Sequence, residues 1–149
     1  MRKFVLTVGL AAGLLVIVGC SSSGGSPSAS SSAAASSSGG LTGKTWQLTA
    51  TTTKVPAHQG VVTDSQNYTI EFKSDGTFNA KADCNNVSGT YTVVGPALTI
   101  TPGPTTLVQC PPESLSDVYI ATLGNAASWA VADSQLTITT KDEATLTYK

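Results

Sequence analysis

The sequence predicts a mainly β domain of about seven or eight antiparallel strands, curled into a small barrel and closed at one end by a single helix. Apolar and polar residues alternate in short runs over residues 41–149, which is typical of strands with one buried face. Asp, Asn, Gly and Pro separate the runs at short intervals, as tight turns require. Only one segment has the apolar spacing of an amphipathic helix. These 109 residues are enough for one small domain and not for two.

Eight alternating runs are expected to be strands, each with its apolar residues on one face. They lie at residues 44–51, 68–72, 78–82, 87–94, 98–100, 128–131, 135–140 and 144–148. Turn residues separate several consecutive runs, as at Ser74-Asp75-Gly76, Gly95-Pro96 and Asp133-Ser134. A sheet of this kind leaves exposed edges unless it closes on itself, which is why we expect a barrel.

The single helix is expected between the fifth and sixth runs. Its apolar stripe has the spacing i, i+3, i+4, i+7 and i+8 and consists of Leu115, Val118, Tyr119, Thr122 and Leu123. Pro111 and Pro112 suit the start of a helix, and Gly124 suits the position just after its end. We therefore expect the helix to begin near the two prolines and to bury this stripe.

The first 19 residues are expected to be a lipoprotein signal peptide. Arg2 and Lys3 precede an apolar or small run at residues 4–19, which leads into Cys20 through Ile17-Val18-Gly19. This ending resembles a lipobox, in which cleavage precedes the cysteine that accepts diacylglycerol. The alternative is a short membrane anchor, but sixteen helical residues reach only roughly 24 Å, less than a hydrocarbon core of ~30 Å. We expect lipidation at Cys20 and a location on the extracytoplasmic side of the cell membrane, or at the outer membrane in a diderm host.

Residues 20–40 are expected to be the lipidated cysteine and a flexible tether. The tract is rich in Ser, Gly and Ala and contains no charge and no large apolar side chain after Cys20. Such a composition buries too little surface to offset the entropy of ordering, and its r.m.s. reach is roughly 25 Å. The domain proper then spans residues 41–149.

Charge limits the partners that the mature protein can have. Removal of residues 1–19 leaves six basic and nine acidic residues, a net charge of about −3. Without a basic patch, neither nucleic acid nor anionic lipid headgroups are expected partners. Membrane contact is expected through the lipid on Cys20, with an envelope protein or a protease as the remaining kind of partner.

Two cysteines, Cys84 and Cys110, remain in the exported domain once Cys20 carries lipid. A disulfide between them is the simplest expectation in an oxidising compartment. It would close a loop of about 27 residues and stabilise the fold by about 3.5 kcal/mol. The alternatives are unpaired buried thiols, a redox pair without the usual Cys-x-x-Cys spacing, and a metal site with His58, which would lack a fourth ligand.

Little in the sequence points to catalysis, and we expect no enzyme activity, no cofactor and no metal. The single histidine, His58, follows Pro56 in a loop where a solvated imidazole is expected, although a spatial Ser-His-Asp arrangement stays open. Asn85 and Asn86 could bind a ligand, but they more commonly satisfy backbone groups in a bend. Trp46 and Trp129 are expected in the core, with a ligand cavity as the alternative.

An ordered series of motifs resembles the META domain family of HslJ-like lipoproteins. The series comprises Asp83-Cys84-Asn85-Asn86, Ser88-Gly89-Thr90-Tyr91, Leu98-x-Ile100 and Thr106-x-x-x-Cys110, followed by Glu113 and the helix of Tyr119. The opening Leu41-x-Gly43-x-x-Trp46-x-Leu48 and the last two strands also fit. The motif residues that the resemblance singles out are Asn85, Gly89, Tyr91 and Thr106. Asp83 stands where the family usually has Gly, and the connection at residues 54–66 is longer than usual.

The resemblance implies a conical β-barrel crossed by a helix, and no established reaction. Family members are linked to stress tolerance of the cell envelope, which suggests a binding or structural module. Two alternatives stay open at this point: a protease inhibitor acting through the loop at 54–66, stiffened by Pro56, and a carrier of a small apolar ligand inside the barrel.

Overall fold

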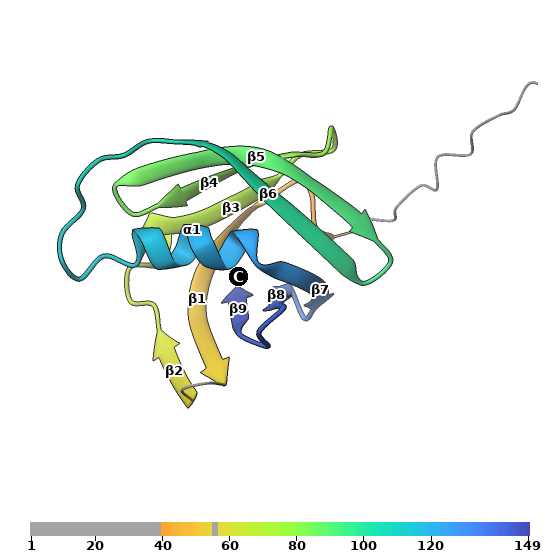
Figure 1. Cartoon of the computed structure of the whole chain (residues 1–149). Coiled ribbons are helices and arrows are strands. Elements are labelled where there is room, and N and C mark those ends of the chain that lie inside the picture. The colour runs from red at the N-terminus through yellow and green to blue at the C-terminus, as the bar shows by residue number, and fades with distance from the viewer. Residues whose placement is uncertain (1–39, 55–56) are drawn as a thin grey trace, which may run out of the picture. The chain divides into compact units, whose positions relative to one another are not determined.

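The computed structural model describes residues 40–54 and 57–149. The lipobox, Cys20, the tether up to residue 39, and residues 55–56 of the 54–66 connection, which include Pro56, lie outside the described residues. Within them, nine strands, one α-helix and one short 3-10 helix follow one another along the chain (Figure 1). Their bounds are β1 Thr45–Lys54, β2 Ala57–Val61, η1 Ser65–Asn67, β3 Tyr68–Phe72, β4 Thr77–Ala82, β5 Asn85–Val94, β6 Ala97–Thr105, α1 Ser116–Gly124, β7 Ala126–Ala132, β8 Gln135–Thr140 and β9 Thr145–Tyr148.

The strands form one antiparallel sheet that closes on itself. Its order is β2-β1-β3-β4-β5-β6-β7-β8-β9, and β1 also pairs with β9, so eight strands form a ring and β2 lies outside it. This confirms the mainly β class with one helix. The ring has its fewest paired residues between β6 and β7. These strands are joined by the pair Ala97–Ser128 and by a hydrogen bond from the Trp129 amide to the Pro96 carbonyl. Helix α1 lies beside β6 (Figure 1).

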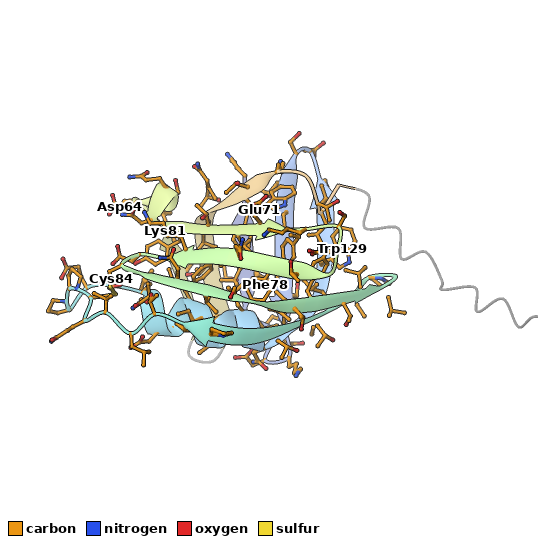
Figure 2. All side chains as sticks on the ribbon, turned by 90° about the horizontal axis from the view of Figure 1, so that it is seen from above. Asp64, Glu71, Phe78, Lys81, Cys84 and Trp129 are labelled. Atoms are coloured by element: carbon orange, nitrogen blue, oxygen red, sulfur yellow. A yellow bond between two sulfur atoms is a disulfide. The ribbon has the colours of Figure 1, made fainter. Side chains whose placement is uncertain are left out.

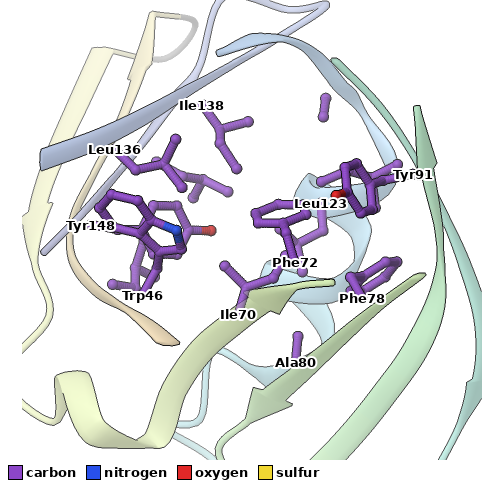
Figure 3. Close-up of a cluster of buried hydrophobic side chains, with 14 of the residues drawn as sticks. Trp46, Ile70, Phe72, Phe78, Ala80, Tyr91, Leu123, Leu136, Ile138 and Tyr148 are labelled. Atoms are coloured by element: carbon purple, nitrogen blue, oxygen red, sulfur yellow. The ribbon is translucent and has the colours of Figure 1, made fainter. Parts of the chain in front are cut away.

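Apolar side chains fill the inside of the ring. Period-two alternation sends Tyr68, Ile70 and Phe72 of β3 inward, and β4 does the same with Phe78, Ala80 and Ala82. All six belong to one buried cluster, and Figure 3 shows four of them, Ile70, Phe72, Phe78 and Ala80, meeting side chains of β1, β8, β9 and α1. Trp46 is fully buried there and its Nε1 donates to the Leu41 carbonyl at 2.8 Å. Trp129 is only half-buried at the edge of the core, so its predicted core position is right only in part.

The 54–66 connection is not the free loop that the sequence suggested. Residues 57–61 form strand β2, which pairs with β1 from Ala50–Val61 to Lys54–Ala57. The connection also contains the 3-10 helix η1. Alternation fails to predict β2 because the strand reads Ala-His-Gln-Gly-Val, without a regular apolar face.

The helix begins later and presents a different face from the predicted one. It starts at Ser116, and Pro111 instead takes part in a turn that the Ser114 amide closes on the Pro111 carbonyl. Ser116, Tyr119 and Leu123 are buried, whereas Leu115 and Val118 are exposed. Gly124 is the last helical residue, not a left-handed residue after it.

Turns follow the predicted chemistry closely. Gly76 has φ +83°, and Asp75 accepts hydrogen bonds from the Thr77 hydroxyl and amide at 2.6 and 2.9 Å, which lower the pKa of Asp75. Asp83 has φ +58°. It therefore adopts the left-handed conformation that a glycine would adopt more readily, and the tight turn is kept despite the substitution.

Two buried tyrosines make the stability sensitive to alkaline pH. The Tyr148 hydroxyl donates to the Tyr119 hydroxyl at 3.4 Å, and burial raises the pKa of both above the usual value of 10. The folded state keeps both protonated where the unfolded chain ionises. The contribution of the two protonated tyrosines to the free energy of unfolding is therefore fully present below pH ~10. It is lost above that pH, by up to about 1.4 kcal/mol per pH unit for each tyrosine.

Denaturant unfolding from neutral to alkaline pH should show that the free energy of unfolding falls less steeply with pH in Tyr148→Phe than in the wild type. Parallel declines for both proteins would contradict this assignment.

Candidate functional site

The disulfide Cys84–Cys110 joins the turn before β5 to the segment at residues 106–115 that connects β6 to α1. The two Cα atoms are 5.7 Å apart, and the sequence separation is 26. The predicted disulfide is confirmed, and the alternative of unpaired thiols is wrong. Among the described residues, no group of three or more His, Cys, Asp and Glu side chains is placed to hold a metal ion.

Asn85 is the centre of a buried hydrogen-bond network beside the disulfide. Its Oδ1 accepts from the Val108 amide at 2.8 Å and from the Thr106 hydroxyl at 3.1 Å. Its Nδ2 lies 3.1 Å from the Val108 carbonyl, 3.2 Å from Ser116 Oγ and 3.3 Å from Cys110 Sγ. The side-chain amide thus satisfies backbone groups of the connecting segment, as the prediction that Asn85 bonds to the backbone expected. These backbone groups lie in the segment at residues 106–115 and not in a bend next to Asn85.

Thr106 extends the pairing of β5 with the connecting segment. Its amide donates to the Asn86 carbonyl at 3.0 Å, and its hydroxyl accepts from the Asn86 amide at 2.9 Å. The same hydroxyl donates to Asn85 Oδ1. The motif residues Asn85 and Thr106 are therefore brought together with both cysteines.

We call the region around the Cys84–Cys110 disulfide and the Asn85 side chain the corner. Two residues that the sequence did not single out connect the start of the helix to it. The Leu115 amide donates to the Tyr68 hydroxyl at 2.9 Å, and Ser116 is buried next to Asn85. Tyr68 is the first residue of the run at 68–72 that the sequence predicts to be a strand, and Ser116 lies outside the predicted apolar stripe. No pattern in the sequence marks either contact.

Gly89 and Tyr91 belong to the same motif series but lie further along β5. A Cβ on Gly89 would overlap the Thr101 carbonyl oxygen and lie 2.8 Å from Phe78 Cε1, so glycine allows close approach of β5 and β6. The Tyr91 hydroxyl donates to the Lys73 carbonyl at 2.7 Å, and its ring packs edge-on against Phe72 at 4.9 Å. Both residues hold the sheet together and neither contacts the corner.

Exposed apolar side chains gather around the corner. We call this the corner surface; it consists of Leu107, Val108, Pro111, Pro112, Leu115 and Val118, all exposed. A hollow of about 310 Å³ adjoins it. Val108 and the two prolines line this hollow together with Gln109, Cys110, Ser114, Ser116 and Asp117. Figure 2 shows Cys84 at the end of the domain opposite Trp129.

A wider groove of about 660 Å³ runs over the outer face of the sheet. It is lined by residues of β1, β3, β4 and β5, among them the polar Glu71, Asn79 and Lys81 and the apolar Ala80 and Val87, and by the end of β6. Figure 2 shows Glu71 and Lys81 on this face. A sheet with one buried face places polar side chains on the other in any case, so the groove needs no ligand to explain it.

The shifted pKa values do not point to acid–base chemistry near neutral pH. Hydrogen bonds from Thr140 and Asn125 lower the pKa of Asp142, as Thr77 does for Asp75. Burial raises the pKa of Tyr91, Tyr119 and Tyr148. A general acid or base works best with a pKa close to the operating pH, and all five shifts lead away from neutral pH.

Asn85→Ala is expected to lower the free energy of unfolding by about 2–3 kcal/mol, because it leaves the Val108 amide and the Ser116 hydroxyl without their buried partner. Asn86→Ala is the matched control, since that side chain is exposed and the bonds described above use its backbone. Its expected change is within about 0.5 kcal/mol. Denaturant unfolding of both variants measures the difference, and equal effects would refute the role given to Asn85.

Solved structures share this fold at low sequence identity. An NMR structure of a protein from Burkholderia xenovorans superposes with a TM-score of 0.59 at 20% identity, covering 73% of this chain and 82% of that one. A crystal structure of a DUF4847 family protein from Bacteroides vulgatus gives a TM-score of 0.52 at 16% identity, covering 72% and 92%. Identities this low show the fold alone. Among curated proteins, none matches the sequence significantly.

The sequence profile of the META domain matches residues 39–149, which is most of the chain and includes every described strand. The Asn85, Gly89, Tyr91 and Thr106 positions all lie within the match, as do both disulfide cysteines. The chain belongs to the META domain family.

Proposed function

We propose that this protein is a lipid-anchored, non-enzymatic binding module of the bacterial cell envelope, which acts through its outer surface in tolerance of envelope stress. The observation that carries the proposal is the contrast between a filled interior and the apolar corner surface. Trp46, Phe72, Phe78 and Tyr148 are fully buried inside the ring. At the corner, by contrast, Leu107 is 93% exposed.

The anchoring rests on the sequence pattern that ends at Cys20. The disulfide supports it, because such bonds persist in oxidising, extracytoplasmic compartments. In the part of the chain that the structure describes, no helix has the length and apolar character needed to cross a membrane. The proposed membrane contact is the lipid alone.

The two alternative functions have less support. Carriage of an apolar ligand inside the ring would require space that the buried aromatic side chains occupy. Inhibition of a protease through residues 54–66 would require an exposed loop, whereas 57–61 are paired with β1. Neither is favoured by a specific observation.

The proposal is tested in the native host with the full chain. A deletion strain should lose tolerance to heat and detergent, wild-type protein should restore it, and Cys20→Ala should leave the protein outside the membrane fraction without restoring tolerance. Unchanged tolerance of the deletion strain would overturn the stress role. Membrane fractionation of Cys20→Ala identical to that of the wild type would overturn the anchor.

A further inference from the structure

We infer that the corner surface docks a protein partner through an apolar segment flanked by lysine or arginine. The inference rests on the proposed function and deepens it, because it names the surface that binds and the chemistry of what it binds.

The exposed large apolar side chains of the domain are concentrated at this corner. Six such residues are exposed in the described part of the chain, and four of them lie between residues 107 and 118. Leu107, Val108 and Val118 have 93%, 57% and 64% of their surface exposed. Single exposed apolar residues need no explanation, but a cluster on one connection and the adjoining helix face marks an interaction site.

The backbone under these side chains is held in place. Asn85 binds both the amide and the carbonyl of Val108, and the disulfide fixes Cys110 two residues later. Tyr68 holds the Leu115 amide at the other end of the segment. A loop fixed in this way loses little conformational entropy when it binds, which favours docking.

Charge selects the kind of partner. Asp83 lies next to the disulfide, Glu113 follows the two prolines, and Asp117 lines the same hollow as Val108. Lys81 lies beside Asp83, since both bond to Asn67, but residues 82–140 themselves contain no Lys or Arg. Glu113 and Asp117, in the same stretch as the exposed apolar side chains, attract a basic-flanked segment and disfavour both anionic lipid headgroups and a second copy of the same surface.

The corner also lies away from the point at which the chain enters the domain. Thr42 bridges to Phe72, and Gly40 lies beside Val131, both at the end where β3 finishes. The disulfide is at the opposite end, next to the start of β3 and the end of β4, and Figure 2 labels its Cys84 there. A domain attached through its N-terminal side thus leaves the corner surface accessible.

Site-specific photocrosslinking of the full chain in its host tests the inference. The probe is p-benzoylphenylalanine, placed at position 107 in one variant and at position 94 in a control variant. Val94 is also a strongly exposed apolar residue, with 73% exposure, and lies outside the corner surface. The expected result is a protein adduct from 107 and not from 94, whose crosslinked peptide, read by mass spectrometry, has an apolar residue with lysine or arginine close on either side. The double variant Glu113→Gln/Asp117→Asn should lower the adduct yield roughly fivefold.

Four results would overturn the inference: no adduct at 107, an adduct with a lipid, an adduct with a second copy of the chain, or a partner segment without basic residues. Membrane fractionation of the same cells distinguishes failure of this inference from failure of the proposed function. A protein that stays anchored and supports stress tolerance without a crosslink at 107 would refute the corner surface and leave the tethered module standing.

Discussion

Gly89→Ala is expected to lower the free energy of unfolding by about 3 kcal/mol or more, one of the largest effects of a single added methyl group in this domain. The new Cβ would overlap the backbone carbonyl of Thr101 and lie 2.8 Å from Phe78 Cε1 and 3.0 Å from the Gly103 amide nitrogen. Two of these three neighbours are backbone atoms, so the strain cannot be relieved by a change of rotamer. The β5–β6 ladder must shift instead, and strand β5 begins at Asn85.

Gly124→Ala provides the control for that substitution. Its Cβ would meet only the Pro102 ring, at 3.3 and 3.5 Å, and alanine favours the helix over glycine. We expect a change within about 1 kcal/mol, of either sign. Denaturant unfolding of both variants decides the matter; a Gly89→Ala protein as stable as the wild type would show that β5 and β6 are not as close as described.

Removal of the disulfide is the second large effect. Cys84→Ser/Cys110→Ser is expected to lower the free energy of unfolding by about 3.5 kcal/mol, mainly because the unfolded chain regains the freedom of a loop of this length. The disulfide holds the segment at residues 106–115, which Asn85 also holds through its hydrogen bonds to Val108. We therefore expect the effects of this change and of Asn85→Ala to be non-additive.

A double-mutant cycle measures that coupling. The four proteins needed are the wild type, the disulfide variant, Asn85→Ala and their combination, each unfolded by denaturant under the same conditions. An interaction of about 1 kcal/mol would show that the two contacts hold one segment. Strict additivity, or a disulfide contribution below about 1 kcal/mol, would contradict a shared role.

The sequence predicts most strands because their chemistry is local. Period-two alternation places Ile70, Phe72 and Phe78 inside, and turn residues such as Gly76 mark the reversals correctly. Strand β2 is not predicted, because its residues show no apolar alternation and its conformation depends on its pairing with β1. The buried face of the helix is predicted only in part, because the side chains of the core against which it packs decide which face is buried. Val118 fits the apolar stripe and is nevertheless exposed.

The corner could be predicted only in outline. Counting cysteines after lipidation of Cys20 predicts the Cys84–Cys110 pair, and the motif resemblance draws attention to Asn85 and Thr106. The contacts of Asn85 with Val108 and Ser116 span 23 and 31 residues. Pairings at that distance depend on how β6 and α1 are placed and leave no local pattern. The exposure of Leu107 is likewise a tertiary result.

Amide hydrogen exchange at Val108 tests the central claim that the corner surface is a preformed, rigid binding surface. Val108 is exposed, yet its amide donates to the buried Asn85 side chain at 2.8 Å. In the full oxidised chain this amide should exchange at least about tenfold more slowly than in an unstructured peptide, and Asn85→Ala should remove the protection. A Val108 amide that exchanges at the unstructured rate in the wild-type protein would show that the segment is not held, and would contradict the account.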